Sequence, residues 1–336
     1  MEKKKNDFIA QGSILAVASI LVRVMGMIYR IPMTAIIGDK GNGFYSYAYS
    51  VYTILLLLSS YSLPLAVSKM VSAKAQLGQW RNVKRVFICA IAFAIGIGTT
   101  FGLTVLIGAQ FFTRVFFHSE LAAIALRFMA PTILIMALLG VFRGFFQGLQ
   151  NTLPTAVSQI VEGLINAIMS VVFAYFLFDF GHGMDVASGT TDLGYAWGAA
   201  GGAIGTGAGA LAGLIFCFIL FVAYRKILAV NISRDKTGTQ QEYGDIFRLM
   251  LSIALPVILS TALYNLIELV DGSLFNNIMA SKGMEDVKDS MWGAYNAKAL
   301  LLVHIPVSIS SAMAVSLVPT LTAAYALGDE QTAKSK

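Results

Sequence analysis

The chain has 336 residues, of which 57% are hydrophobic and only 12% are charged, and its mean hydropathy is +0.73. Soluble domains carry about 25% charged residues, so this composition excludes a soluble protein and predicts an all-α polytopic membrane protein. The net charge of +6 does not indicate a nucleic-acid partner, because the basic residues lie in short clusters between apolar runs, as in multi-pass membrane proteins.

Apolar runs long enough to span a bilayer recur along the whole chain and predict about eight transmembrane helices. They lie at about 9–37, 44–73, 86–113, 121–148, 153–178, 196–224, 247–279 and 291–327. Basic residues gather in the segments that a cytoplasmic N-terminus places inside, and the outer segments contain only Lys40, Arg114, Lys282 and Lys288. This asymmetry predicts that both ends of the chain face the cytoplasm.

The first predicted helix carries a polar stripe inside its apolar run. Ser19, Arg23, Gly26 and Arg30 follow the spacing i, i+4, i+7, i+11 and therefore share one side of a helix. An arginine at membrane depth costs from about 2.5 to over 10 kcal/mol, so two on one stripe predict a water-filled, positively lined cavity. For Arg30 the alternative is a position near the outer end, with its guanidinium at the interface. Arg23 lies near mid-span and has no such exit.

The run 38–43 is rich in glycine and predicts a tight outer turn before the second helix. Tyrosines follow at the outer end of that helix, as in an aromatic belt. Further along, Ser59, Ser60, Ser62 and Pro64 soften the helix and predict a cavity lining.

Arg143 and Glu162 lie toward the cytoplasmic ends of the fourth and fifth predicted helices. These two helices are adjacent and antiparallel, so the two side chains are candidate ion-pair partners. Two interpretations remain open: a structural pair, or a gate or substrate contact. After the fifth helix, 179–195 is predicted to be a solvated outer loop. The sixth helix has small residues at the spacing that lets helices approach closely in lipid; these are Gly194, Gly198, Gly202, Gly205, Gly209 and Gly213.

The predicted seventh helix contains two carboxylates one turn apart, Glu268 and Asp271. They indicate either a cation or proton site or partners for the buried arginines. Lys298 lies in the predicted eighth helix. Gating or ion-coupling candidates are therefore Glu162, Glu268, Asp271 and Lys298. Basic residues outnumber acidic residues within the predicted spans, and this excess favours an anionic cargo. The sequence contains no cluster with the spacing of a metal site, and we expect no metal and no catalytic residue.

A weak internal repeat appears at an offset of 250 residues. It aligns the second and eighth predicted helices, with Gly43 opposite Gly293 and Tyr45 opposite Tyr295. The offset implies a parallel repeat with a period of six helices. We therefore expect a six-helix lobe at 1–228, a cytoplasmic linker at 229–246, and the first two helices of a second lobe at 247–336. We also expect the chain to be part of a longer protein.

Four short motifs carry a family resemblance: Arg23-Val-Met-Gly26, Pro64-Leu-Ala-Val-Ser-Lys69, Arg143-Gly-Phe-Phe-Gln-Gly148 and Pro154-Thr-Ala-Val-Ser-Gln159-Ile-Val-Glu162. Together they resemble the bacterial polysaccharide transporters related to stage V sporulation protein B and the lipid II flippases. These proteins belong to the multidrug/oligosaccharidyl-lipid/polysaccharide exporter superfamily. The resemblance covers essentially the whole chain and implies two lobes around a central cavity.

The resemblance implies flipping of an undecaprenyl-pyrophosphate-linked saccharide across the bacterial cytoplasmic membrane by alternating access. Arg23 falls on a helix-1 motif that lines the cavity in lipid II flippases, whereas Arg30 is displaced by one residue from a second basic position. The basic residues that those flippases carry early in helix 2 are absent from 53–58. We expect Arg23, Arg30 and Arg143 to bind substrate, no cofactor apart from a coupling Na⁺ or H⁺, membrane lipids as partners, no nucleic acid, and a monomer.

Two other functions compete with this interpretation. A cation-coupled multidrug antiporter of the same superfamily favours an acidic lining, opposite to the charge excess found here. A membrane enzyme acting on glycosyl-lipids needs a metal-ligand cluster, an Asp-x-Asp pair or a nucleophile motif at a span end, and the sequence has none. The sequence therefore predicts a transporter rather than an enzyme.

Overall fold

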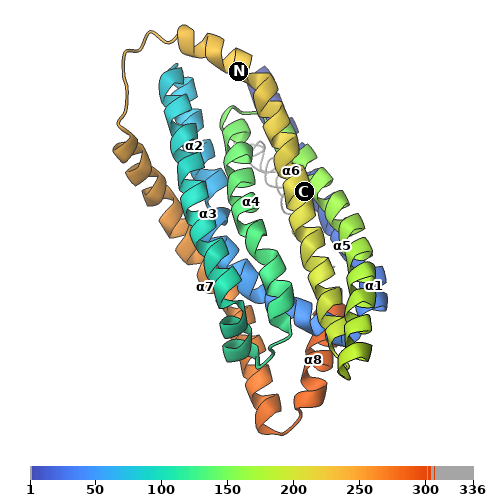
Figure 1. The fold of residues 1–336 in the computed structure, drawn as a ribbon. Coiled ribbons are helices and arrows are strands. Elements are labelled where there is room, and N and C mark those ends of the chain that lie inside the picture. The colour runs from blue at the N-terminus through green and yellow to red at the C-terminus, as the bar shows by residue number, and fades with distance from the viewer. Residues whose placement is uncertain (1, 301, 304–305, 307–336) are drawn as a thin grey trace, which may run out of the picture.

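The computed structural model describes residues 2–300, 302–303 and 306, and this part of the chain is helical almost throughout (Figure 1). The elements in chain order are α1 (Glu2–Leu56), the π-helical turn η1 (Leu57–Tyr61), α2 (Leu63–Gln76), α3 (Trp80–Phe117), α4 (Ala122–Gly148), α5 (Leu153–Ser188), α6 (Leu193–Ser233), α7 (Tyr243–Ser281), α8 (Glu285–Ala294) and the π-helical turn η2 (Tyr295–Ala299). The predicted all-α class is confirmed for these residues.

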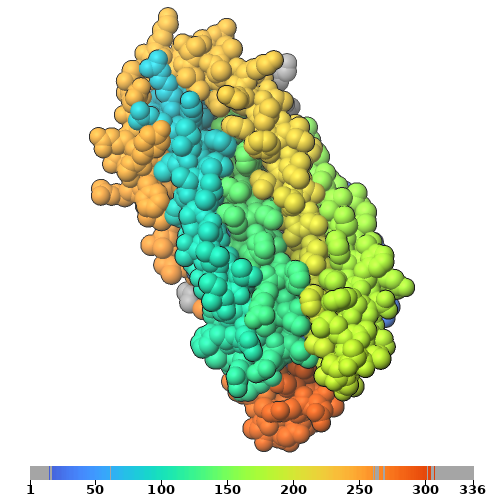
Figure 2. Space-filling model, viewed as in Figure 1, coloured from blue at the N-terminus to red at the C-terminus, as the bar shows by residue number. Residues whose placement is uncertain are grey.

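The long helices run side by side in an elongated bundle, and α8 covers one end of it (Figures 1 and 2). Within the described residues, five segments are long and apolar enough to cross a membrane: Val17–Gln76, Trp80–Phe117, Ala122–Gly148, Leu153–Ser188 and Leu193–Ser233. The first covers two predicted spans. The predicted seventh span lies in α7, and most of the predicted eighth, 291–327, lies outside the described residues.

The predicted outer turn at 38–43 is not a loop. Only Gly38 leaves the helical conformation, with φ 62° and ψ −177°, and α1 continues beyond it after a kink. The Asn42 side-chain amide donates hydrogen bonds to the Gly38 carbonyl at 2.8 Å and to the Thr34 hydroxyl at 3.1 Å. Because the Asn42 amide bonds the Gly38 carbonyl that the break exposes, the chain can continue from one helix into the next without a loop.

The predicted second span is interrupted by η1 before α2 begins. Pro64 cannot donate a backbone hydrogen bond, and in a regular helix its ring collides with the carbonyl four residues earlier. The wider π turn at 57–61 removes this conflict. On the inside of this turn, the Ser59 and Ser60 hydroxyls lie 2.8 Å apart and are buried.

The predicted outer loop at 179–195 is also shorter than expected, because α5 extends to Ser188 and α6 begins at Leu193. The Asp185 carboxylate accepts hydrogen bonds from the backbone N–H groups of Leu193 at 3.0 Å and Gly194 at 2.8 Å, and from the Thr190 hydroxyl at 2.6 Å. A carboxylate on the free N–H groups of α6 stabilises that helix start. The connection therefore needs only a few residues.

The glycines of α6 make the close helix contacts that their spacing predicts. A side chain at Gly205 would collide with Ser170 of α5, and one at Gly202 with Met33 of α1. The buried apolar residues form two clusters. One lies among α1, α3, α4 and α6 toward α8, and the other joins α2, α3, α4 and α6 to Ile246 and Met250 of α7.

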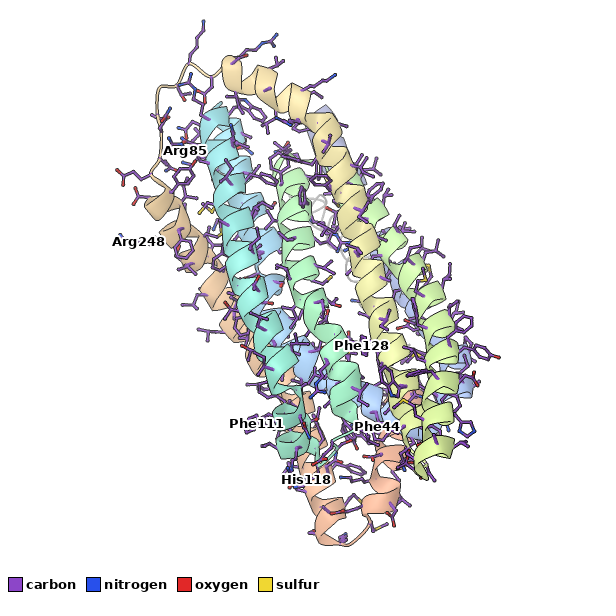
Figure 3. The ribbon with its side chains drawn as sticks, in the orientation of Figure 1. Phe44, Arg85, Phe111, His118, Phe128 and Arg248 are labelled. Atoms are coloured by element: carbon purple, nitrogen blue, oxygen red, sulfur yellow. The ribbon has the colours of Figure 1, made fainter. Side chains whose placement is uncertain are left out.

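The segment between α6 and α7 comprises residues 234–242 and is attached to the start of α3. The Asp235 carboxylate accepts a hydrogen bond from the Arg81 N–H at 2.9 Å. The Asn82 side chain donates to the Thr239 carbonyl and accepts from the Gln241 N–H, at 3.1 and 3.0 Å. Figure 3 shows this end of the bundle, where Arg85 and Arg248 are labelled. The predicted linker 229–246 is thus helical at both ends, and its middle is held against α3.

Candidate functional site

Arg143 of α4 and Glu162 of α5 form the predicted ion pair. The Arg143 Nη2 atom lies 2.7 Å from Glu162 Oε2, and the Arg143 Nε atom donates to the Ser158 hydroxyl at 2.9 Å. The Arg143 side chain is only 11% exposed and the Glu162 side chain 24%. Two donor groups of the guanidinium are thus oriented by α5, and most of its charge is balanced.

Glycines of α4 allow this pair to lie inside the bundle. A side chain at Gly144 would collide with the Pro64 backbone of α2, and one at Gly148 with Val71 and the Ser68 carbonyl. On α6, a side chain at Gly209 would meet the Glu162 carbonyl. The small residues therefore bring α2, α4, α5 and α6 close together around Arg143 and Glu162.

Arg23 has a different environment. Its side chain is exposed, and no carboxylate pairs with it within the described residues. One turn away, the Ser19 hydroxyl lies 3.5 Å from Gln159 Oε1 of α5. A side chain at Gly26 would meet nothing within 4 Å. The stripe from Ser19 to Gly26 therefore borders α5 on one side and is open on the other.

Gln159 and Glu162 lie on the same turn of α5, so α5 connects the Arg23 stripe to Arg143. Arg30, the last member of the stripe, is half-buried and lies within electrostatic range of Tyr45. The Tyr45 hydroxyl lies 3.3 Å from the Thr206 hydroxyl of α6. Arg30 is thus partly covered by its neighbours, and its position on a cavity stays a prediction.

A row of tyrosine rings extends from Arg30 toward the ion pair. Tyr45 stacks on Tyr49 with ring centroids 5.8 Å apart, and Tyr49 lies 5.9 Å from Tyr52. Tyr52 in turn interacts electrostatically with Glu162. These rings are buried or half-buried, so they line the interior of the bundle instead of forming an aromatic belt at its surface.

Of the two acidic candidates on α7, the structure describes the side chain of Asp271. Asp271 is exposed and forms no ion pair within the part of the chain that the structure describes. The Glu268 side chain lies outside the described residues. Lys298 lies in η2, where its Nζ atom is 2.7 Å from Asp39 Oδ2 of α1. The Lys298 contact therefore joins the first and last described helices.

That contact belongs to a crossing between α1 and α8 that sequence reasoning missed; we call it the outer crossing, after the side on which the predicted topology puts it. A side chain at Gly43 would collide with the Asp289 carbonyl, and one at Gly293 would collide with the Asp39 carbonyl. The two contacts of this crossing are equivalent at the 250-residue offset, because Asp39 corresponds to Asp289 and Gly43 corresponds to Gly293. The repeat identified the glycines, but it did not indicate that the two copies touch.

Aromatic and charged side chains surround the outer crossing. The Tyr47 ring stacks between Phe117 at 4.7 Å and Trp292 at 6.3 Å, measured between ring centroids. Lys288 Nζ donates to the carbonyls of Phe117 and His118 at 3.2 and 2.7 Å, at the C-terminal end of α3, where a cation is favoured. Figure 3 shows His118 and Phe44 at this end of the bundle. No group of three or more metal-ligating side chains gathers anywhere in the described residues.

Comparisons with known proteins identify relatives of this chain. A family model described as "Polysaccharide biosynthesis protein" matches residues 8–324. The chain is 26% identical over 328 residues to the lipid II flippase MurJ of Bacillus subtilis (strain 168), covering 94% of this chain and 58% of that protein. It is 25% identical over 323 residues to stage V sporulation protein B of the same organism, covering 95% of this chain and 58% of that protein.

The fold is similar to that of a solved transporter of the MOP superfamily from Pyrococcus furiosus. The TM-score is 0.59 at 15% identity, over 98% of this chain and 66% of that chain. The chain thus spans about 58% of the length of the curated relatives described above. The five apolar segments of the described residues and the membrane-protein relatives make it a multi-pass membrane protein, and its fold is similar to that of the solved transporter.

Proposed function

Because the chain belongs to the family of polysaccharide biosynthesis proteins, we propose that it flips an undecaprenyl-pyrophosphate-linked saccharide across the cytoplasmic membrane by alternating access. The cargo class includes lipid II and related precursors of cell wall or polysaccharide. The observation that carries the proposal is Arg23, a cation on an apolar membrane helix that is exposed and unpaired within the described residues. Such a residue needs an anionic partner or water.

A pyrophosphate group is a suitable anionic partner for Arg23. It carries about two negative charges and several acceptor oxygens, and an arginine contacts it with two parallel N–H donors. Arg23 and Arg30 bind the pyrophosphate along the stripe, while Arg143, oriented by Glu162, contributes at the cytoplasmic entrance. The polyprenyl tail stays in the lipid as the head group crosses.

Alternating access needs a closed outer end while the inside is open. The outer crossing provides such a closure, with Lys298 and Asp39 as a gate contact. Glu162 holds the inner arginine, and Glu268 or Asp271 couples the movement to Na⁺ or H⁺. The N-terminus faces the cytoplasm, and the protein acts as a monomer in lipid, without nucleic acid.

The relatives support a transporter rather than an enzyme, since two of them are named a lipid II flippase and a sporulation protein. A cation-coupled drug antiporter shares the fold. Its organic-cation cargo requires free carboxylates in the pathway, and the exposed Asp271 of α7 is the carboxylate that it would use. Next to the α1 stripe, however, the carboxylate of Glu162 is paired with Arg143, whereas Arg23 has no carboxylate partner in the described residues. The arrangement of charge therefore favours an anionic cargo.

A flipping assay in liposomes that contain the full-length protein tests the proposal, with lipid II and other lipid-linked oligosaccharides as substrates. We expect Arg23→Ala to lower the flipping rate about tenfold or more, because a charge-assisted contact of about 1.5–3 kcal/mol is lost. Arg114→Ala is the matched control. Arg114 is an exposed arginine at the outer end of α3 whose surface pair with Glu120 spans 3.5 Å, and its loss should leave flipping unchanged. Wild-type flipping of every substrate by Arg23→Ala would refute the proposal.

A further inference from the structure

Asp289 of α8 is a buried carboxyl group in the outer crossing. Its residue is only 9% exposed, and its Oδ1 atom has no hydrogen-bond partner in the part of the chain that the structure describes. An ionised oxygen buried without a partner is strongly disfavoured. The surroundings of Asp289 therefore favour its neutral form.

Asp39, the equivalent of Asp289 in the repeat, also has a buried Oδ1 atom without a hydrogen-bond partner in the described residues, but its other oxygen contacts a cation. Asp39 is paired with Lys298 at 2.7 Å. At the 250-residue offset, the residue that corresponds to Lys298 is Ala48, which is fully buried. The same crossing thus has an ion pair on one side and an unpaired carboxyl on the other.

The hydrogen bonds of the neighbouring Tyr47 and Asn276 limit what Asp289 can accept. The Asn276 amide donates through Nδ2 to the Gly272 carbonyl at 2.8 Å, so its Oδ1 atom faces Tyr47 and can only accept. The Tyr47 hydroxyl donates to Asn276 Oδ1 at 2.9 Å. Tyr47 also shares a hydrogen bond with the Asp289 side chain. Because the Tyr47 proton is already donated to Asn276, it can only partly stabilise an ionised Asp289.

Other charged groups face Asp289 from three elements, and each has a partner of its own. Lys40 of α1 is paired with Asp192 at the start of α6, at 2.7 Å. Lys288, the neighbour on α8, donates to the carbonyls at the end of α3. Burial raises the pKa of the Asp289 carboxyl above its ordinary value, although Lys288, Tyr47 and Lys40 act in the opposite direction.

We propose that Asp289 is a proton-binding site that controls the outer crossing. The buried carboxyl keeps its proton while α1 and α8 are in contact. When the crossing opens, the carboxyl releases its proton to water and becomes a hydrated carboxylate. Because the closed form binds one more proton than the open form, acid favours closure and rising pH favours opening. The role of this opening in transport rests on the proposed function, but the proton site itself does not.

Trp292 reports on the crossing, because it is 6% exposed and lies against Tyr47. In the variant Trp80→Phe/Trp197→Phe it is the remaining tryptophan of the chain. We expect acrylamide quenching of its fluorescence in lipid nanodiscs to be low in acid and to rise severalfold between about pH 4 and 8, with a one-proton midpoint above the ordinary range for aspartate. Asp289→Asn should keep quenching low at every pH. Asp286→Asn, an exposed carboxyl on the same helix, should keep the midpoint of the parent.

Tyr47→Phe gives a second readout that does not need the Asn variant to fold. Because Tyr47 lowers the pKa of Asp289, removing its hydroxyl should raise the midpoint by about one pH unit, the shift expected from the loss of one hydrogen bond. A parent protein without a pH transition, an unchanged transition in Asp289→Asn, or an unchanged midpoint in Tyr47→Phe would each overturn the proposal. These measurements use no cargo, so a failure of flipping leaves their outcome unaffected.

Discussion

Arg23 and Arg143 show how one residue type takes two roles within the same bundle. Arg143 is largely buried, and its guanidinium is oriented by Ser158 and Glu162. Arg23 is exposed and lies beside an open position at Gly26. The two environments differ because a carboxylate of α5, Glu162, faces Arg143 and none faces Arg23 within the described residues. The α1 stripe therefore carries a cation that no carboxylate of the described residues neutralises.

Removal of Glu162 alone should be harmful, because it leaves Arg143 as an unpaired charge in the interior. We expect Glu162→Ala to destabilise the protein by about 3 kcal/mol, the lower end of the range for buried pairs, since Glu162 is partly exposed. Thermal unfolding in detergent measures this loss.

The double variant Arg143→Leu/Glu162→Leu separates the structural role of the pair from a role in cargo binding. It should recover most of the lost stability, because an apolar pair can replace a buried ion pair. We expect its flipping rate to stay about tenfold below wild type if one contact to the pyrophosphate is lost. A stable double variant that flips at the full rate would show that Arg143 does not touch the cargo.

At the scale of the elements, the 234–242 segment attaches α7 to the start of α3. The Asp235 carboxylate accepts from the Arg81 N–H, from the Thr237 N–H at 3.0 Å and from the Thr237 hydroxyl at 2.6 Å. Arg85 donates to the Gln241 carbonyl, and its guanidinium lies 5.2 Å from the Tyr243 ring centroid. The first turn of α3 therefore holds the chain that enters α7.

These hydrogen bonds lower the pKa of Asp235, with the Arg81 N–H as the main cause. A carboxyl with a lowered folded pKa stabilises the attachment fully above its unfolded value of about 3.9 and loses that effect as the pH falls through the folded pKa. The protection factor of the Arg81 amide, which corrects for the intrinsic pH dependence of hydrogen exchange, should therefore fall in acid below this value.

At neutral pH, Asp235→Ala should expose the same segment. We expect trypsin to cleave at Lys236 severalfold faster than in the wild type. Asp245→Ala, which removes an exposed carboxylate from the first turn of α7, should not change the rate. Equal cleavage of the Asp235 variant and the wild type would mean that the carboxylate does not hold the segment.

The outer crossing depends on backbone contact at Gly43 and Gly293. A leucine at Gly293 cannot fit against the Asp39 carbonyl, so Gly293→Leu should force α1 and α8 apart. We expect Trp292 to become open to acrylamide at all pH values. Gly183→Leu provides the control, since a side chain there meets nothing within 4 Å. Continued protection of Trp292 in the Gly293 variant would contradict the contact.

At the scale of the whole molecule, local patterns predicted the helices and the pair between neighbouring helices. Arg143 and Glu162 could be matched because they lie on consecutive antiparallel helices in apolar surroundings. The end of the first helix could not be predicted, because the glycine-rich run 38–43 is typical of a turn, and only the structure shows Asn42 satisfying the Gly38 carbonyl.

The outer crossing was beyond prediction for a different reason. Gly43 and Gly293 are 250 residues apart, and a sequence repeat indicates that two segments are alike without indicating that they meet. Asp39 and Asp289 precede the aligned window. Their equivalence became visible only when the structure showed each of them against the glycine of the other copy. The roles of Arg23, Arg30 and the α7 carboxylates in transport remain predictions.

The attachment of the 234–242 segment to α3 also has a consequence for biosynthesis. When Met250 leaves the ribosome, the partners of Asp235 in α3 and the apolar cluster that buries Met250 have already been made. The outer crossing needs Gly293, which is synthesised later, and it must close across most of the chain. A nascent chain paused between α7 and α8 therefore has a finished inner half and an outer end that still lacks its closure.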